Sequence, residues 1–322
     1  MDRGLPTASR SPGEGQAGQG ALARPFPFLA ALEAHGRWLR GEEGGRQLRL
    51  HGVTWSGRMA PGARLSKASF RHVTWVETDL AEADLSEVTL EDVDLRRSTL
   101  SGVDLMGAEM DLVRLDRSFL TGANFCEARL TGCSFVDAHM PECRMMEANM
   151  RSCDLTRVVA RRASFHQMKM FDCKTVNADL EEAQLYHARI EFSVLNGVAA
   201  SGANFSSVKI HTSELIRAEM PGARFFRADL SRSNFFRADL RRCDFREAVL
   251  HGAELVRANL QEARFGDASL MAADLRGADL TGALEMTPQM LMRARTDETT
   301  LLPNGKPGPY LRLSGAERPA RK

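Results

Sequence analysis

A strict five-residue period runs through most of this chain and constrains its fold more than any other feature. Every fifth position from Leu65 to Leu280 is Leu, Phe, Met, Ile or Trp in 41 of 44 cases. The exceptions are Ala160, Thr175 and Ala200. Because only 43% of the whole chain is hydrophobic, chance does not produce this column. An α-helix needs apolar spacings of three and four residues, which a period of five does not supply.

A second column of small residues precedes the first by two positions. From Ala63 to Ala278 its 44 positions hold 24 Ala, 8 Val, 5 Cys, 5 Ser, Thr78 and Met168. Two inward residues separated by one outward residue have the alternation of a short β-strand. The two remaining residues of each repeat must therefore turn the chain. A type II turn favours Pro as the first of these two residues and Gly as the second, where φ is positive. These turn signals occur at Pro61-Gly62, Ser101-Gly102, Thr121-Gly122, Ser201-Gly202, Pro221-Gly222 and Thr281-Gly282.

Several runs resemble the Ala-(Asp/Asn)-Leu-x-x signature of the pentapeptide-repeat family. They are Ala228-Asp229-Leu230, Ala238-Asp239-Leu240, Ala258-Asn259-Leu260 and Ala273-Asp274-Leu275. The resemblance implies an all-β fold, a right-handed parallel quadrilateral β-helix with four repeats in each 20-residue coil. Residues 63–282 would then form about 11 coils, and partial coils would extend the rod.

The chain divides into five segments by composition. Residues 1–24 are predicted to be disordered, 25–47 to form a helical N-terminal cap, and 48–284 to form the β-helix. Residues 285–305 are predicted to form a C-terminal capping helix and turn, in which Thr287 caps the helix and Pro288 takes its first position. Residues 306–322, which are basic and contain Pro and Gly, are predicted to be a disordered tail. The weakest link in the repeat is Arg58 with Ala60 in the first coil.

Charge and composition narrow the function classes. The 43 basic and 42 acidic side chains give a net charge of +1, so no global field favours nucleic acid or an anionic membrane. No stretch approaches the roughly 20 apolar residues that span a bilayer, and the N-terminus lacks the apolar core of a signal peptide. The sequence therefore predicts a cytoplasmic protein without a membrane segment. Five of six cysteines share the small inward column, which predicts buried core residues rather than disulfides.

The repeats do not predict catalysis or a cofactor. A catalytic site needs a concave pocket in which reactive groups converge, and no long loop interrupts these repeats. One outward column, which continues to Tyr186 and Phe226, places Cys126, Met146 and His166 in a row. These are soft metal ligands, but a fourth ligand is missing, so no metal site is predicted. The same outward position predicts that the thiol of Cys126 is exposed.

The candidate interaction face combines apolar and basic columns. Residues 20 apart in sequence lie directly above one another in such a coil, which stacks two columns side by side. Because aromatic residues and arginines are enriched in protein interfaces, we expect a protein partner here, with Tyr186 and Phe226 as an alternative edge. The two columns consist of Ile216, Phe236 and Val256, and of Arg217, Arg237 and Arg257.

The predicted function is that of a non-catalytic interaction or scaffold module. The alternative is a regulator related to nucleic acid, since some pentapeptide-repeat proteins protect type II topoisomerases by imitating DNA. Residues 76–112 carry 11 acidic and 2 basic side chains, which suits such a mimic, whereas the arginines of residues 217–257 suit a weak DNA binder. The sequence favours neither over a protein partner. The resemblance also leaves open a homodimer through one end of the rod.

Overall fold

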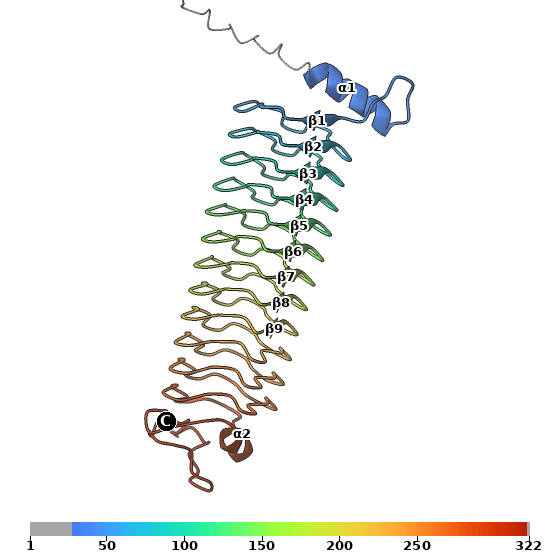
Figure 1. Ribbon diagram of the computed structural model, residues 1–322. Helices are drawn as coiled ribbons and strands as arrows, with labels where there is room; N and C mark the ends of the chain where they lie inside the picture. The colour runs from blue at the N-terminus through green and yellow to red at the C-terminus, as the bar shows by residue number, and fades with distance from the viewer. Residues whose placement is uncertain (1–27, 321–322) are drawn as a thin grey trace, which may run out of the picture.

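The computed structural model describes residues 28–320, which form a rod of stacked coils (Figure 1). Nine short strands lie along one wall of the rod in sequence order and form one parallel sheet. Each residue of a strand pairs with the residue 20 positions later in the next strand, as Leu50 does with Phe70. The strands are β1 (Arg49–His51), β2 (Ser69–Arg71), β3 (Thr89–Glu91), β4 (Glu109–Asp111), β5 (Arg129–Thr131), β6 (Asn149–Arg151), β7 (Lys169–Phe171), β8 (Arg189–Glu191) and β9 (Lys209–His211).

The same offset from coil to coil holds on the other walls as single β-bridges. Thr54 pairs with Thr74, and the ladder continues as far as Arg264 with Leu284. The fold is therefore the predicted parallel β-helix with a 20-residue coil. The named sheet makes eight such steps, fewer than the 11 coils predicted. Beyond β9 the same wall continues only as single bridges, from Lys209 to Asp229, then to Val249 and Ser269.

The two inward columns form one continuous apolar core. All 44 residues of the large column are buried, and in the small column only Ala63, at the N-terminal end, is partly exposed. The buried hydroxyls of the small column bond to backbone carbonyls, as Ser98 does to Trp75 at 2.8 Å, so they carry no unpaired polar cost. Cys133, Cys143, Cys153, Cys173 and Cys243 are free and buried, as predicted. Burial raises the pKa of Cys143 and Cys243, which keeps these thiols neutral.

The corners of the coil place one residue of each repeat at positive φ. The predicted turn glycines adopt it, among them Gly102 at +67° and Gly222 at +69°. At most other corners a residue with a side chain takes this conformation, such as Glu77 at +57° and Phe192 at +53°. A side chain at positive φ is uncommon. The hydrogen bonds between coils compensate for it, because most such N–H groups donate to a carbonyl in the next coil, as Glu77 N–H does to Arg96 at 3.0 Å.

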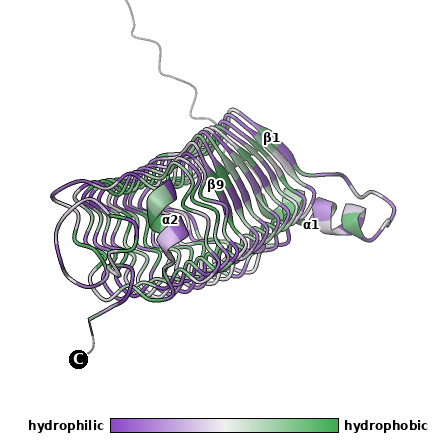
Figure 2. Cartoon of the chain, turned by 90° about the horizontal axis from the view of Figure 1, so that it is seen from below, coloured by the Kyte–Doolittle hydropathy of each residue, from purple (hydrophilic) through white to green (hydrophobic). Residues whose placement is uncertain are grey.

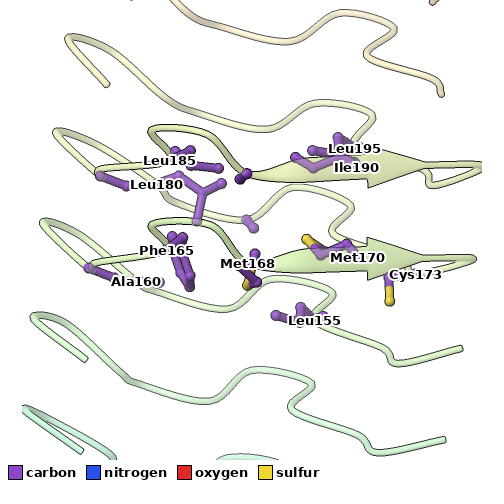
Figure 3. Packing of buried hydrophobic residues seen from close by; sticks show 14 of the residues in the cluster. Leu155, Ala160, Phe165, Met168, Met170, Cys173, Leu180, Leu185, Ile190 and Leu195 are labelled. Atoms are coloured by element: carbon purple, nitrogen blue, oxygen red, sulfur yellow. The ribbon is translucent and has the colours of Figure 1, made fainter. Parts of the chain in front are cut away.

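One coil near the middle of the rod exchanges its large and small residues. Ala160 occupies a large position and Met168 a small one, and both are buried (Figure 3). Met170, Phe165 and Leu180 lie around them in the same core. The long, unbranched Met168 thus supplies volume where Ala160 leaves it out. The pairing register between coils continues through this region without interruption, so the exchange is a repacking of the core.

Thr175 in this region is buried with its hydroxyl unpaired. It stands in the large column, is 2% exposed, and its Oγ1 has no hydrogen-bond partner among the described residues. We expect Thr175→Val, which keeps the shape and removes the hydroxyl, to raise the free energy of unfolding by about 1 kcal/mol. Urea denaturation followed by circular dichroism measures this change. Ser98→Ala provides the contrast: it removes a hydroxyl that is hydrogen-bonded to the Trp75 carbonyl, so we expect it to lower the free energy of unfolding.

The N-terminal end is partly closed by α1 (Phe28–Leu39). Phe28 packs on Trp55 with ring centroids 4.0 Å apart, and His35 is fully buried. The His35 ring links two segments of the first coils: the Leu48 N–H donates to Nδ1 at 3.0 Å, so Nε2 carries the proton and donates to the Ser66 carbonyl at 2.9 Å. The helix therefore docks through specific hydrogen bonds as well as apolar contact. In Figures 1 and 2 it extends beyond the outline of the coils.

The C-terminal end is covered by α2 (Pro288–Arg293) and by the chain that follows it (Figure 2). Thr287 caps α2, and its Oγ1 accepts the Met290 N–H at 3.2 Å with Pro288 in the first turn. Met290 and Leu291 of the helix are buried. They extend the apolar core past the last coil, so this helix acts as the predicted lid.

The prediction of a disordered tail after residue 305 is wrong for the part that the structure describes, residues 306–320. This segment folds back on residues 296–304: Tyr310 N–H donates to Thr296 Oγ1 at 2.9 Å, and Tyr310 Oη donates to Glu317 at 3.1 Å. Ala316 is only 4% exposed. Composition misled here because the Pro and Gly residues make turns that return the chain to the rod. The segment 1–24, also predicted to be disordered, lies outside the described residues.

Candidate interaction surface

The predicted docking face lies on one corner of the rod. We call Ile216, Arg217, Phe236, Arg237, Val256 and Arg257 the Arg217 wall. Its three apolar side chains are half-buried, and its three arginines are exposed at the positive-φ corner position. The coils are joined by hydrogen bonds from Arg217 N–H to the Phe236 carbonyl at 2.9 Å and from Arg237 N–H to the Val256 carbonyl at 3.0 Å. The columns therefore stand in register, one coil apart.

The arginines of this wall have no acidic partner among residues 28–320. The guanidinium of Arg237 lies 5.1 Å from the ring centroid of Phe236, a cation–π contact. At the equivalent corner positions of the same coils, arginines pair with a glutamate one coil away: Arg227 with Glu247 at 2.6 Å and Arg242 with Glu262 at 2.9 Å. The Arg217 wall instead stacks like charges about 4.8 Å apart, which costs roughly 1 kcal/mol per pair in water.

The alternative edge lies on a different corner from the Arg217 wall. Phe226 and Phe236 are ten residues apart, half of a 20-residue coil, so the four-sided coil places them at opposite corners. Tyr186, 42% exposed, contacts His187 and His166 with centroid distances of 4.0 and 6.4 Å. At this corner Phe226 lies under Arg227 at 4.8 Å, and Glu247 already neutralises that arginine. The structure therefore does not join the predicted residues into one surface.

The thiol in the column of soft ligands is buried. Cys126 is 8% exposed, which contradicts the expected exposed thiol. The longer Met106 and Met146, one coil away on either side, are 44% and 38% exposed and shield the shorter side chain between them. Within residues 28–320, no group of three or more His, Cys, Asp or Glu side chains is placed to hold a metal ion.

Two exposed features of the sheet wall escaped the sequence analysis. Phe171 and Phe192 are 42% and 54% exposed and pack edge to face with centroids 5.3 Å apart. Beside them, Lys169, Arg189 and Lys209 stand in register on β7, β8 and β9 without an ion pair among the described residues. A bulky residue at the corner position of Phe192, where Gly or polar residues are usual in this chain, was the one signal available.

The acidic segment is partly neutralised by neighbouring coils. Six of its eleven carboxylates pair with basic side chains, for example Glu77 with Arg97 at 3.0 Å and Asp94 with Arg96 at 2.7 Å. The others in pairs are Glu87, Glu91, Asp92 and Glu109. Five carboxylates have no ion pair among residues 28–320, namely Asp79, Glu82, Asp84, Asp104 and Asp111. The local charge of the surface is therefore weaker than the sequence count of residues 76–112 implies.

None of the helices in residues 28–320 is long and apolar enough to cross a membrane. No curated protein sequence matches the chain.

The solved structures that are similar to this chain include two pentapeptide repeat proteins and a fluoroquinolone resistance protein. HetL, a pentapeptide repeat protein involved in heterocyst differentiation in the cyanobacterium Nostoc, is 23% identical, with 84% of this chain and 96% of HetL covered and a TM-score of 0.27. QnrB1, a plasmid-mediated fluoroquinolone resistance protein, is 16% identical, with 74% and 84% covered and a TM-score of 0.36. A pentapeptide repeat protein of the Arabidopsis thaliana thylakoid lumen is 28% identical over 33% of this chain and 74% of its own, with a TM-score of 0.30.

The family model for pentapeptide repeats matches the chain in eight copies, over residues 63–102, 108–145, 223–261 and 250–284. These stretches lie inside the β-helix, where the five-residue period and the 20-residue coil are both observed. The chain therefore belongs to the pentapeptide-repeat family.

Proposed function

We propose that this protein is a non-catalytic interaction module that docks another protein through the Arg217 wall. The observation that carries the proposal is the row of three arginines without acidic partners among residues 28–320, whereas the equivalent positions at other corners of the same coils carry Arg–Glu pairs. The fold gains nothing from stacking like charges, because they repel. A partner with carboxylates would relieve this repulsion.

The apolar column beside the arginines supports a protein partner over a simple anion. Ile216, Phe236 and Val256 are half-buried in three successive coils, so a bound surface would complete their burial. Aromatic and arginine side chains that become desolvated together are typical of the residues that dominate binding energy. The basic row on β7–β9 lacks such a column, because its neighbours Phe171, Glu191 and His211 differ in character. We therefore place the docking face on the Arg217 wall.

The test is a quantitative pull-down from lysate of the native cells. The wall variant combines Ile216→Asp, Phe236→Asp and Arg237→Glu, and the control variant combines Lys169→Glu and Arg189→Glu on the sheet wall. We expect a partner that wild type and the control variant both recover and that the wall variant loses at least about tenfold, in line with the loss of a desolvated interface centre. Circular dichroism must show that all three proteins fold alike.

Equal recovery by the wall variant would rule out this surface as the docking site. Loss in the control variant alone would move the site to β7–β9.

The competing proposal is a DNA mimic that acts on a type II topoisomerase. The five carboxylates of residues 76–112 that lack ion pairs are the observation in its favour. Mimicry of duplex DNA requires an unbroken acidic surface, and six neighbouring carboxylates are already paired within the rod. We therefore expect no change in topoisomerase supercoiling activity when the protein is added. Inhibition that disappears in an Asp79→Asn, Glu82→Gln, Asp84→Asn variant would replace the proposal above.

A further inference from the structure

The first coil departs from the repeat at two inward positions. Arg58 stands where the next coils have Thr78 and Ser98, and Ala60 stands where they have Leu80 and Leu100. Leu80 and Leu100 are completely buried, whereas Arg58 is exposed and Ala60 is only partly covered. One large apolar side chain is therefore missing from the end of the core, and a cation lies beside the vacancy.

The missing side chain leaves an open apolar groove of about 940 Å³ between α1 and the first coil. Phe28 and Leu29 line it from the helix, and Trp55, Met59 and Ala60 line it from the coil. Its floor is rigid, since Trp55 packs on Phe28 and, edge to face at 5.9 Å, on the buried Trp75. Leu29 and Met59 on the rim are 77% and 75% exposed. Such an exposed apolar concavity is typical of a binding groove.

The surroundings of the groove are basic. Residues 28–75 carry eight basic side chains against Glu33, Glu42 and Glu43, a net charge of +5. Arg58 lines the groove itself, and Arg37 and Arg64 line a second hollow of about 460 Å³ that adjoins it at Leu32. Glu33, Arg40 and Glu42 also line that hollow, where Arg40 is paired with Glu42. Among the described residues Arg37, Arg58 and Arg64 form no ion pair.

We propose that this end of the rod binds an acidic amphipathic segment of another protein. Its apolar side chains would enter the groove over Trp55 and Ala60, and its carboxylates would meet Arg58, Arg37 and Arg64. Burial of the groove lining provides the affinity, and the three cations provide the preference for an acidic partner. The site is independent of the Arg217 wall, because its residues belong to the opposite part of the rod.

Charge argues against two segments of this chain as occupants of the groove. Residues 1–27 carry three basic and two acidic side chains, a net charge of +1. The C-terminal end of a second copy, residues 285–320, carries five basic and four acidic side chains, again +1. Neither complements a basic rim. A flat anionic membrane has the right charge, but it cannot fill a groove whose floor is set behind Leu29 and Met59.

The test uses the full chain and two kinds of probe. The dye 1-anilinonaphthalene-8-sulfonate joins an aromatic apolar body to an anion, and its fluorescence reports occupancy of the groove. Two synthetic amphipathic peptides with the same leucine face, one with glutamates and one with lysines on the other face, then compete with the dye. We expect the glutamate peptide to displace the dye at a concentration at least about tenfold lower than the lysine peptide, because charge complementarity is reversed between them.

Two variants locate the binding site. Ala60→Leu restores the repeat and fills the groove, so we expect dye and peptide binding to fall at least about tenfold while the melting temperature rises. Arg58→Glu leaves the groove open, and we expect the glutamate peptide to bind about tenfold more weakly, since one charge contact becomes repulsive. Arg232→Glu, an exposed change far along the rod, is the matched control and should leave binding unchanged.

Several results would overturn the proposal. They are equal binding of the two peptides, unchanged binding by the folded Ala60→Leu variant, and binding to vesicles of phosphatidylglycerol without binding to the glutamate peptide. Self-association that Ala60→Leu abolishes would identify a second copy as the occupant instead. An increase in dye binding by Phe26→Ser would identify the chain's own N-terminal segment as the occupant.

Discussion

Replacing Phe225 with alanine is expected to lower the free energy of unfolding by about 3–5 kcal/mol, the cost of removing a large aromatic side chain from a rigid core. Phe225 is fully buried, and its ring stacks between Phe205 and Phe245 with centroid distances of 5.0 and 5.1 Å. The backbone ladder keeps neighbouring coils about 4.8 Å apart, so the coils cannot collapse into the cavity. Urea denaturation followed by circular dichroism measures the loss.

The control for this prediction is an exposed phenylalanine. Phe119 is 54% exposed and touches His139 only at its edge, with centroids 6.4 Å apart. We expect Phe119→Ala to change stability by less than about 1 kcal/mol. If the two variants lost similar stability, the core would not be packed as the stacked rings require.

Lowering the pH from 8 to 5 is expected to release α1 from the end of the rod. Burial lowers the pKa of His35 below its ordinary value of 6.5. An undocked His35 therefore binds a proton more readily than a docked one, so the stability that it contributes is complete above pH 6.5 and is lost as the pH falls through the lowered pKa. Protonation also ends the hydrogen bond that Nδ1 accepts from Leu48 N–H. Hydrogen exchange of residues 28–39, measured across this range, follows the release.

The variant His35→Phe tests the same contact at constant pH. It keeps an aromatic ring beside Trp38, which lies 5.5 Å from the His35 ring, but it leaves the Leu48 N–H and the Ser66 carbonyl unpaired. We expect docking of α1 to weaken by about 1–3 kcal/mol, the cost of buried polar groups without partners, and to lose its pH dependence between pH 5 and 8. The exposed His187 serves as control: a His187→Phe variant that abolished the pH dependence would refute the assignment to His35.

The core could be predicted residue by residue because one rule governs every repeat. Leu65 to Leu280 and Ala63 to Ala278 point inward wherever the period holds, and the structure buries them, with Ala63 only partly covered. The predicted turn glycines take positive φ for the same reason. Even the exchange of Ala160 and Met168 was visible in the sequence. The length of the coil was not, because a period of five fits a coil with any number of sides, and the four-sided coil came from resemblance to a family.

Contacts between residues far apart in the chain escaped prediction. Cys126 is buried because Met106 and Met146, in the coils on either side, stand over it. Six of the eleven carboxylates of residues 76–112 are neutralised by ion pairs with basic side chains in neighbouring coils or repeats, as Glu77 is by Arg97. The tail after residue 305 folds because Thr296 and Glu317 bond to Tyr310. Composition records none of these pairings.

By itself, the sequence determined which side chains face inward, that the chain forms a repetitive β-fold, and that a short helix lies at each end of it, because strand alternation and helix capping act over a few neighbouring residues. Only the tertiary structure decided which outward side chains meet, since that depends on how many residues complete a coil. It left Arg217, Arg237 and Arg257 without acidic partners among residues 28–320, buried Cys126, and opened the groove at Ala60. Local periodicity sets the fold, whereas the surfaces that would bind partners arise from the stacking of one whole coil on the next.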